Sequence, residues 1–281
     1  MKDLKTIRGM PDLYDEDVER ISIVENICLE TFKSFNFQEF RTPIVENKTL
    51  FQRSVGESSD IIQKEVYEFE DRNGEILCLR PEGTAGLVRA LITNGLMNDE
   101  IKKFFYLGPM FRYERPQKGR KRQFFQAGAE LIGEESTKSD VEIILLAKTI
   151  LEKLNVRYTL EINYLGKEDS LNSYRSYLRK YLQNFKDELS EKVYSRLQRN
   201  PIRAIDSKDS NIQEIFKKAS DISDFLKKEE KESFERTIKS LKDLKIDFNL
   251  NKNLVRGLDY YTGTVFEFTV DGLGAQNAVI G

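Results

Sequence analysis

The chain has 281 residues, of which 39% are hydrophobic and 33% are charged, and this composition indicates a folded, soluble protein of one large domain or two rather than a disordered chain. Lysine and arginine together number 45, and aspartate and glutamate 47, so the formal net charge is −2. This balance argues against a general binder of polyanions, although local basic patches remain compatible with a nucleotide or nucleic-acid site.

The sequence contains no histidine and only two cysteines, Cys28 and Cys78. Their spacing does not match a metal site, so we expect no structural zinc and interpret both cysteines as small core residues. Without histidine the usual general base near neutral pH is missing, and catalysis would depend on carboxylates, arginines, backbone groups or a metal ion. The charged N-terminus and the lack of an apolar run of about 20 residues predict a cytoplasmic protein without a membrane span.

The first elements in chain order are a helix, a short strand and a hairpin. Residues 21–32 carry apolar side chains at helical spacing. Residues 38–41 then predict a short strand. Residues 67–79 contain two strand-like runs on either side of a polar turn with Asn73-Gly74, which predicts a hairpin.

The middle of the chain predicts two strands that flank a charged loop. A loop at residues 81–84 first leads into a helix through residues 87–90. Residues 104–107 are apolar and aromatic and predict a buried strand. The charged residues 114–121 separate this strand from a second one that begins near Gln123.

The second half of the chain is dominated by helical patterns. Residues 140–154 predict a helix, and residues 158–164 alternate as a strand does. From 167 to 244, charged and polar residues surround apolar residues at helical spacing, which predicts a separate helical lobe with a solvated face. Strand character returns at Val255 and in residues 264–270.

The sharpest local feature is the segment 112–122, which holds six basic residues and one acid. Arginine forks bind phosphate oxygens through paired, charge-assisted hydrogen bonds, so such a loop can hold a triphosphate. An exposed basic loop without a ligand is the alternative interpretation. The segment matches neither a glycine-rich phosphate loop nor a dinucleotide fingerprint, so phosphate binding would come from side chains on a sheet.

Three weaker features carry chemistry elsewhere. In residues 80–84 a carboxylate and a hydroxyl beside a glycine could hold an amino group, with an ordinary turn before a helix as the alternative. Residues 254–261 place an arginine among apolar residues and before two tyrosines, which predicts a pocket, with a buried tyrosine pair as the alternative. Gln126 and Glu130 are four residues apart on a strand and share a face, with Gly128 between them leaving space.

Together these segments resemble a class II aminoacyl-tRNA synthetase, and specifically the histidyl-tRNA synthetase family, over residues 7–281. Residues 108–120 are similar to motif 2 of that class, and residues 254–267 to the family's histidine-specific signature. Residues 41–43 (Arg-Thr-Pro) fall where motif 1 lies, at the dimer interface. Several long matches in the same order carry the resemblance.

The resemblance implies an α+β fold, a homodimer and three segments. The catalytic core would comprise residues 1–166 and 245–281, with an antiparallel sheet flanked by helices. Residues 167–244 would form a helical insertion domain that approaches the acceptor arm of tRNA. The family's motif 3 and anticodon-binding domain would follow Gly281, so the sequence leaves open whether this chain is active alone.

The resemblance also implies a histidine–tRNA ligase reaction. The carboxylate of L-histidine attacks the α-phosphate of ATP, which Mg²⁺ accompanies, and the terminal ribose hydroxyl of tRNA(His) then accepts the histidyl group. Arg112 and Arg256 would be the catalytic cations, and no protein metal site is expected. The residues implied for ATP are Arg112, Glu114, Arg120 and Phe124. The residues implied for histidine are Glu82, Thr84, Arg112, Gln126, Glu130, Arg256, Tyr260 and Tyr261.

Two other interpretations come from different functional classes. The regulatory subunit of ATP phosphoribosyltransferase, an enzyme of histidine biosynthesis, resembles this catalytic domain but charges no tRNA. The intact residues 81–84 and the arginine-rich residues 112–122 argue against it, because a relative that charges no tRNA need not keep them. A dimeric RNA-binding or sensor module that uses the fold without chemistry is the third interpretation, which ATP binding without pyrophosphate exchange would support.

Overall fold

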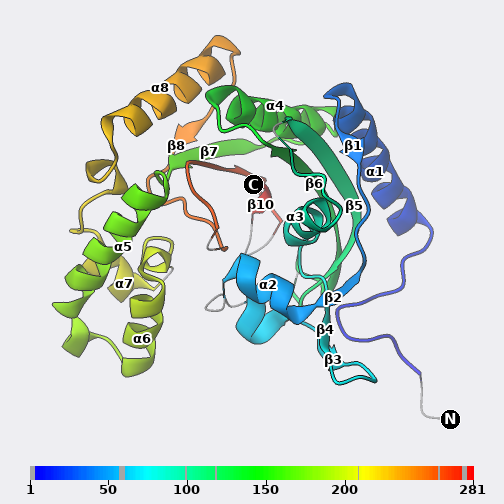
Figure 1. Cartoon of the computed structure of the whole chain (residues 1–281), viewed down its shortest axis with the longest axis horizontal. Coiled ribbons are helices and arrows are strands. Elements are labelled where there is room, and N and C mark those ends of the chain that lie inside the picture. Colours follow the sequence, from blue (N-terminus) through cyan, green and yellow to red (C-terminus); the bar gives the residue numbers. More distant parts are fainter. Residues whose placement is uncertain are drawn as a thin grey trace. The chain divides into compact units, whose positions relative to one another are not determined.

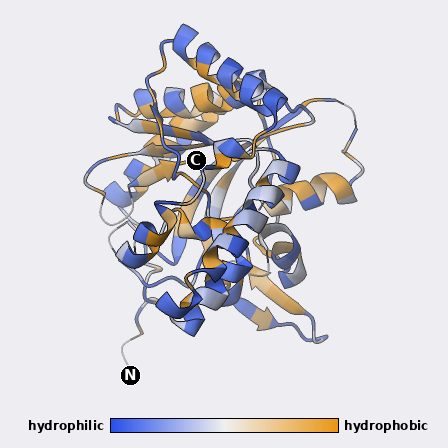
Figure 2. Cartoon of the chain, turned by 90° about the vertical axis from the view of Figure 1, so that its left-hand side faces the viewer, coloured by the Kyte–Doolittle hydropathy of each residue, from blue (hydrophilic) through white to orange (hydrophobic). Residues whose placement is uncertain are grey.

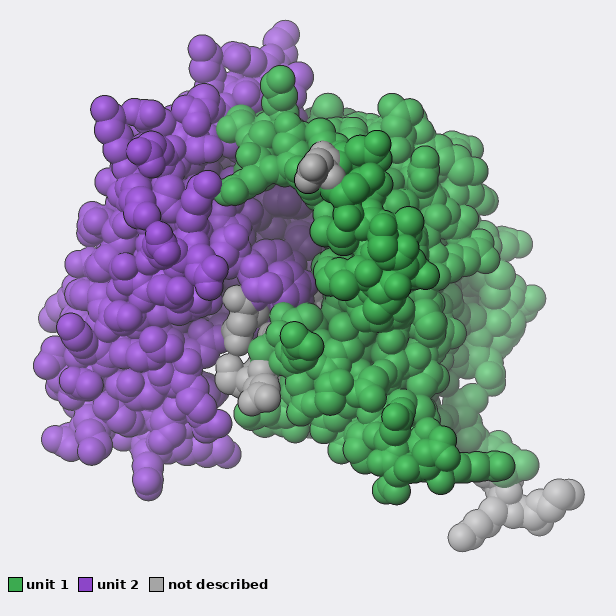
Figure 3. Space-filling view, in the orientation of Figure 1, with its two compact units in different colours: residues 1–157, 270–277 green, residues 158–269, 278–281 purple. Residues whose placement is uncertain are grey.

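The computed structural model describes residues 4–56, 61–98, 100–117, 119–207, 209–258, 260–273 and 277–281. Contacts divide the chain into two compact units (Figure 3): unit 1 comprises residues 1–157 and 270–277, and unit 2 comprises residues 158–269 and 278–281. The division into segments 1–166, 167–244 and 245–281 that the resemblance implies stays a prediction.

Unit 1 combines helices with two small sheets. In chain order its elements are α1 (Glu16–Ser34), β1 (Gln38–Glu39), β2 (Val45–Asn47), α2 (Lys48–Val55), a π-helical turn (Ile61–Glu65), β3 (Glu68–Glu70), β4 (Ile76–Leu79), α3 (Thr84–Thr93), β5 (Lys102–Phe111), β6 (Gln123–Ile132) and α4 (Thr137–Lys153). β4 pairs antiparallel with β2 and β3, and β5 pairs antiparallel with β6 and parallel with β1.

The helix at 21–32 and the hairpin at 67–79 are confirmed. The strand predicted at 38–41 is shorter, because only Gln38 and Glu39 pair with β5.

The β5–β6 hairpin has two chemically different faces. One face packs against α1 and α4, in a buried cluster of Cys28, Phe32, Phe37, Phe105, Leu146 and Ile150. The rings of Phe32 and Phe105 stack with their centroids 4.8 Å apart, and burying a side chain of this size contributes about 1.5–3 kcal/mol. The other face is turned toward α3 (Figure 1) and carries polar side chains, among them Glu130, which contacts Thr84 at the start of α3.

Unit 2 combines a four-stranded sheet with a run of helices. Its elements are β7 (Thr159–Tyr164), α5 (Glu168–Gln183), α6 (Glu191–Arg199), α7 (Ser210–Phe216), α8 (Lys228–Asp243), β8 (Asn249–Leu250), β9 (Thr264–Thr269) and β10 (Ala278–Ile280), with short 3-10 turns at Lys186–Glu188, Pro201–Ala204 and Ile222–Asp224. The strand order is β10–β9–β7–β8, with β7 antiparallel to β9 and parallel to β8. The helical prediction for residues 167–244 is confirmed, and α8 is mostly hydrophilic (Figure 2). Within the described ranges, no helix is long and apolar enough to cross a membrane.

The helices of unit 2 share a core with the segment that follows them. Residues buried in this cluster are Leu165, Leu171, Tyr174, Leu178, Ile202, Ile222, Leu254, Val255 and Val265. The strand predicted at Val255 is wrong, because this residue lies outside the strands. Its apolar character comes from packing against helices rather than from a position in a sheet.

Glu230 links the first and the last helix of the helical region, α5 and α8. Its buried carboxylate accepts hydrogen bonds from the backbone N–H of Lys167 at 2.5 Å, from the Ser170 hydroxyl at 2.6 Å and from the backbone N–H of Lys227 at 2.6 Å. One carboxylate therefore caps the start of α8 and orders the start of α5, which lies about sixty residues earlier in the chain.

Candidate active site

The polar face of the β5–β6 hairpin gathers predicted ligand-binding residues of unit 1. The strand register places Gly108 opposite Gln126 and Tyr106 opposite Gly128. Side chains two or four residues apart on a strand share a face, so Gln126 and Glu130 lie on either side of Gly128 on this face. The hairpin thus sets the spacing of the polar groups.

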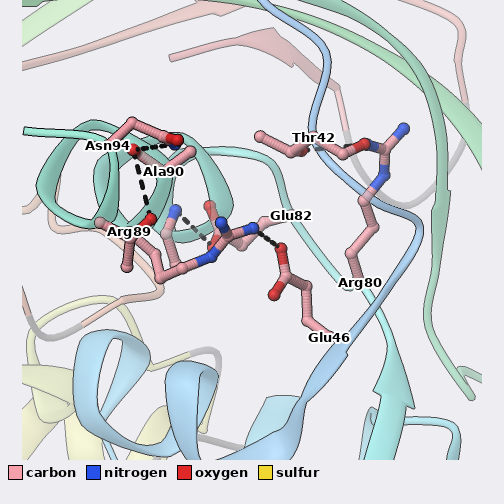
Figure 4. A network of polar contacts seen from close by, with 9 residues as sticks. Thr42, Glu46, Arg80, Glu82, Arg89, Ala90 and Asn94 are labelled. Atoms are coloured by element: carbon pink, nitrogen blue, oxygen red, sulfur yellow. Dashed lines mark hydrogen bonds and ion pairs between the residues drawn. The ribbon is translucent and has the colours of Figure 1, made fainter. Parts of the chain in front are cut away.

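The segment that follows β4 is fixed by Arg80 (Figure 4). Arg80 is 7% exposed and donates from Nε to the carbonyl of Pro109 at 3.0 Å. Its Nη1 donates to the carbonyl and the hydroxyl of Thr42 at 3.0 and 3.2 Å. No carboxylate in the described part of the chain forms an ion pair with Arg80, and burial lowers its pKa. Burying such a cation is costly, so we infer that these bonds to Thr42 and to Pro109 of β5 are what retain it. In the same view Arg89 of α3 pairs with Glu46 of β2.

Glu82 is a carboxylate buried at the start of α3. It is 3% exposed, and its oxygens accept hydrogen bonds from the backbone N–H of Thr84 at 2.7 Å and of Ala85 at 3.0 Å. The first N–H groups of a helix lack partners inside it, and the helix dipole favours a negative charge there. Burial raises the pKa of Glu82, whereas the two N–H donors and the charge of Arg112 oppose the rise. The carboxylate keeps acceptor capacity for an ammonium group.

Glu130 lies at the other end of the same cluster. Its carboxylate accepts a hydrogen bond from the Thr84 hydroxyl at 2.6 Å and a longer one from the Tyr106 hydroxyl at 3.4 Å. The residue keeps some solvent access, but its carboxylate is packed among neighbouring atoms, and this burial raises its pKa to about 7. The charge of Glu82 adds to the rise, and the two hydroxyls oppose it. A carboxyl group that titrates near neutral pH can serve as donor or acceptor to a ring nitrogen.

Tyr106 is a residue of this cluster that the sequence did not indicate. It is 6% exposed, and a Cβ added to Gly83 or to Gly128 would come within 2.3 or 2.2 Å of its ring. Gly128 does leave space between Gln126 and Glu130, but the Tyr106 ring occupies it. Burial raises the pKa of Tyr106 well above its usual range, so the phenol keeps its proton. Only the strand register, which a single sequence does not give, would have revealed the pairing.

Two side chains of the basic segment, residues 112–122, contact each other, and a third contacts an aromatic ring just after it. The guanidinium of Arg112 lies 5.1 Å from the centroid of the Phe124 ring, a cation–π distance. Arg120 Nη1 lies 2.9 Å from Glu114 Oε2, although these atoms are not aligned for a hydrogen bond. The four residues predicted for ATP thus form two contacting pairs, of which only Phe124 lies on β6.

Gln126 and Arg112 present polar groups that suit a ligand. Oε1 of Gln126 is buried and has no hydrogen-bond partner among the residues that the structure describes. An unsatisfied buried acceptor costs stability, so we infer that a bound N–H group satisfies it. Arg112 donates from Nε to the carbonyl of Pro81 at 2.9 Å, which fixes the plane of its guanidinium.

In unit 2 the signature segment, which is residues 254–261 and the first part of the signature-like residues 254–267, places Arg256 in an ion pair. Nη1 of Arg256 lies 2.6 Å from Oε2 of Glu267 on β9, and its guanidinium lies 5.5 Å from the Tyr261 ring centroid. Nε of Arg256 is buried without a hydrogen-bond partner in the described ranges. Burial raises the pKa of Glu267, and Arg256 opposes that rise. Tyr260 and Tyr261 stack at 4.9 Å, but Tyr260 is 38% exposed, so they do not form a fully buried core pair.

The predicted residues fall into two sets. Unit 1 brings together Glu82, Thr84, Arg112, Glu114, Arg120, Phe124, Gln126 and Glu130, and unit 2 brings together Arg256, Tyr260 and Tyr261. The joint action of both sets on one substrate is therefore a proposal. Among the described residues, no group of three or more histidine, cysteine, aspartate or glutamate side chains is placed to hold a metal ion.

A cavity of about 420 Å³ lies on the other, apolar face of the hairpin. Its lining includes Ile21, Val24 and Cys28 of α1 and Leu107, Phe125 and Ala127 of the hairpin. Of the predicted ligand-binding residues, only Phe124 and Gln126 reach it, and the carboxylates do not. The predicted ligand-binding carboxylates therefore lie on the polar face of the hairpin, away from this cavity.

Comparisons with known proteins identify the family of the chain. A family model described as histidyl-tRNA synthetase matches residues 9–280. A histidine–tRNA ligase from Hydrogenovibrio crunogenus is 45% identical over 279 residues, which cover 99% of this chain and 66% of that protein, so the chain spans about two thirds of this relative. The crystal structure of apo S. aureus histidyl-tRNA synthetase matches with a TM-score of 0.75 and 35% identity, over 95% of this chain and 62% of that one.

A second solved structure shares the fold at a greater distance. A Bacillus halodurans protein described as an ATP phosphoribosyltransferase regulatory subunit/histidyl-tRNA synthetase matches with a TM-score of 0.69 and 21% identity, over 98% of this chain and 74% of that one. At this identity the likeness concerns the fold alone. The predicted α+β class is confirmed by the S. aureus structure. With motif 2 and the signature segment placed on that fold and the family model matched along almost the whole chain, the chain belongs to the histidyl-tRNA synthetase family.

Proposed function

We propose that this chain provides the catalytic part of a histidine–tRNA ligase, which activates L-histidine with ATP and transfers it to tRNA(His). The observation that carries the proposal is a cluster of polar groups beside Arg112: Glu82 and Thr84 lie at the start of α3, where Thr84 contacts Glu130, and Glu130 shares the polar face of the β5–β6 hairpin with Gln126. Two carboxylates, a hydroxyl and an amide complement an ammonium group and an imidazole. Family membership supplies the reaction that such a site would serve.

The residues proposed to hold the α-amino group are Glu82, Thr84 and Gln126, and those proposed to line the imidazole pocket are Glu130, Tyr260 and Tyr261. An ammonium group has three donors, and the open acceptors of Glu82 and Gln126 support this assignment. Neutral imidazole offers one donor and one acceptor, which the Glu130 carboxylate and the Tyr261 phenol can satisfy. A site of buried polar groups rejects a substrate without the matching atoms by a large factor.

ATP is proposed to bind along motif 2. Phe124 offers a ring face for adenine, Glu114 recognises the base, and Arg112 and Arg120 contact the phosphates. The Glu114–Arg120 ion pair shows that these two side chains are neighbours, which supports a shared site. When ATP binds, each side chain would leave the other and contact a part of the same nucleotide. Mg²⁺ would come with the nucleotide and take most of its ligands from phosphate oxygens and water.

The histidine carboxylate is itself the nucleophile in the proposed first step, so no side-chain base is needed. One of its oxygens attacks the α-phosphorus, the bond from that phosphorus to the bridging oxygen breaks, and pyrophosphate leaves. Arg112 and Arg256 would stabilise charge on the α-phosphoryl oxygens, and positioning would contribute much of the remaining rate. In the second step the ribose hydroxyl of tRNA takes the acyl group and AMP leaves.

The proposed assembly is a homodimer that works in the cytoplasm. Ile44 and Val45, next to motif 1, are 43% and 41% exposed, and Ile23 and Val24 of α1 are 56% and 43% exposed. Exposed apolar side chains at and beside the motif 1 residues support an interface there. The helices in residues 167–244 are proposed to approach the acceptor arm of tRNA, and sedimentation of the chain at several concentrations would test the dimer.

The test of the function is histidine-dependent exchange of pyrophosphate into ATP, with Arg256→Ala as control and histidine binding measured by calorimetry. Exchange that needs histidine and is lost in the control supports the proposal. If exchange is absent, the part of the H. crunogenus relative that this chain does not cover would be appended. Recovered exchange then supports the ligase, whereas histidine binding without exchange in both forms overturns it and favours a regulatory relative.

A further inference from the structure

Within unit 2 the signature segment is attached to the helical region by a polar contact as well as by the shared core. Leu254 and Val255 are 6% and 7% exposed and belong to the cluster that the helices build. Arg203, in the turn Pro201–Ala204, donates from Nη2 to the carbonyl oxygen of Gly257 at 3.2 Å. Because Gly257 directly follows Arg256, a side chain of the helical region holds the backbone next to the proposed catalytic arginine.

Arg203 is itself oriented by a second bond. Its Nη1 donates to Oδ2 of Asp206 at 2.9 Å, three residues farther along the chain. Arginine presents its N–H groups in a rigid planar fork, so bonds from two of its nitrogens fix the guanidinium plane. A Cβ added to Gly257 would lie only 3.3 Å from Nη2, so the guanidinium sits close against this peptide.

The signature segment also contacts the sheet, through the side chain of Arg256. Arg256 pairs with Glu267 of β9, while its neighbour Gly257 bonds to the helical region through Arg203. Arg203, Arg256 and Tyr261 also line one small pocket of about 20 Å³. The segment that carries the proposed catalytic arginine therefore contacts both the helices and the sheet of unit 2.

We propose that Arg203 is a positioning residue for the signature segment: it fixes the Gly257 peptide, keeps Arg256 and Tyr261 in register, and so couples the helical region to histidine activation. The kinetic part of this inference rests on the proposed function, whereas the contact itself does not. Any displacement of the helices that moves Arg203 changes the bond to Gly257, so a ligand on the helical region would act on the signature segment.

The test compares Arg203→Met and Arg203→Lys with a matched control, Arg199→Met. Arg199 is an exposed arginine of α6 whose Nε bonds to the Ser195 carbonyl of its own helix, so the control removes the same charge from the same region. Hydrogen exchange of residues 254–258, read by mass spectrometry, should be about tenfold faster in Arg203→Met and unchanged in the control. Thermal unfolding of all variants should stay close to that of the unmodified chain.

The kinetic readout separates KM from kcat in pyrophosphate exchange. Loss of a charge-assisted hydrogen bond should raise the KM for histidine about five- to tenfold in Arg203→Met and lower kcat as well. Arg203→Lys should fall between, because a single ammonium group does not reproduce the fork. If Arg203→Met does not fold, Arg203→Lys carries the comparison.

Two results would overturn the inference. The first is equal hydrogen exchange at residues 254–258 in the Arg203 variants and in Arg199→Met. The second is faster exchange there with unchanged KM and kcat. If the unmodified chain performs no pyrophosphate exchange, the proposed function is in question, and hydrogen exchange together with histidine affinity by calorimetry still decides the role of Arg203.

Discussion

The two units hold charge at the residues proposed to bind histidine in opposite ways. In unit 1, Glu82 and Glu130 accept hydrogen bonds from backbone N–H and hydroxyl groups, and within the described ranges no cation forms an ion pair with either. In unit 2, Arg256 is already paired with Glu267 at 2.6 Å. The first arrangement is adapted to receive a positive group, whereas in the second the arginine is oriented in advance but partly neutralised.

The difference also separates two ways of tuning protonation. Burial raises the pKa of both unit 1 carboxylates; the charge of Glu82 adds to the rise in Glu130, whereas the charge of Arg112 opposes the rise in Glu82. In unit 2, Arg256 counteracts the rise that burial causes in Glu267. Removal of one carboxylate should therefore have different consequences in the two units.

The largest effect is expected for Glu82→Gln, which tests the unit 1 arrangement directly. Both carboxylate oxygens of Glu82 accept a hydrogen bond from a backbone N–H group, but only one end of the amide can accept. The amide also offers no negative charge to an ammonium group. The KM for histidine should rise about 100-fold, in line with the loss of charge-assisted hydrogen bonds in a buried site. Steady-state pyrophosphate exchange measures it, with the exposed Glu19→Gln on α1 as control. A KM within twofold of the unmodified chain would remove Glu82 from the site.

A smaller effect, on a different parameter, is expected for Glu267→Gln in unit 2. The amide still accepts a hydrogen bond from Arg256 but no longer supplies the charge that orients it. We expect kcat to fall about tenfold with little change in the KM for histidine. The exposed Glu235→Gln on α8 is the matched control. An increase in kcat would show that Glu267 competes with the substrate for Arg256 instead of positioning it.

The third prediction concerns the pH dependence of stability. Glu130 has a pKa of about 7 in the folded chain against an ordinary value of 4.5. Below the ordinary value both folded and unfolded states hold the proton; as pH rises toward 7 the unfolded state loses it first, so the free energy of unfolding falls through this window and levels off above it.

Glu130→Gln should remove that part of the fall. The free energy of unfolding of the variant, relative to that of the unmodified chain, should rise by about 1–2 kcal/mol from about pH 5 to about pH 7.5. Urea unfolding at both pH values measures this difference. Glu82, whose pKa is also raised, leaves a residual slope of the same sign. An identical pH dependence in both proteins would show that Glu130 ionises normally.

Local patterns in the sequence were sufficient for most of the elements that position the site. The helical spacing of residues 21–32 and the turn at Asn73-Gly74 depend only on neighbouring residues, so α1 and the β3–β4 hairpin could be predicted. The roles of the polar residues came from motif resemblance, and strand periodicity predicted that Gln126 and Glu130 share one face. Four-residue spacing was enough for Gln126 and Glu130 because both lie on one regular strand.

Contacts that depend on pairing between distant segments could not be predicted. Tyr106 meets Gly128 only because of the β5–β6 register, and the bond from Arg203 to Gly257 joins residues 54 positions apart. Val255 looked like a strand residue because apolar character alone does not say whether helices or strands will cover it.

The smallest effect is expected for Tyr106→Phe, which separates the carboxylate from the hydroxyl in unit 1. The Tyr106 hydroxyl lies 3.4 Å from Glu130, a long and weak hydrogen bond, and the remaining ring still fills the space beside Gly83 and Gly128. Histidine affinity by calorimetry should fall about two- to threefold, and thermal stability should be nearly unchanged. Tyr106→Leu, which vacates part of that space, should instead lose about 1–3 kcal/mol of stability. If Tyr106→Phe abolished histidine binding as completely as Glu82→Gln, recognition in unit 1 would depend on a hydroxyl rather than on unpaired carboxylates, and the contrast with the ion pair of unit 2 would no longer hold.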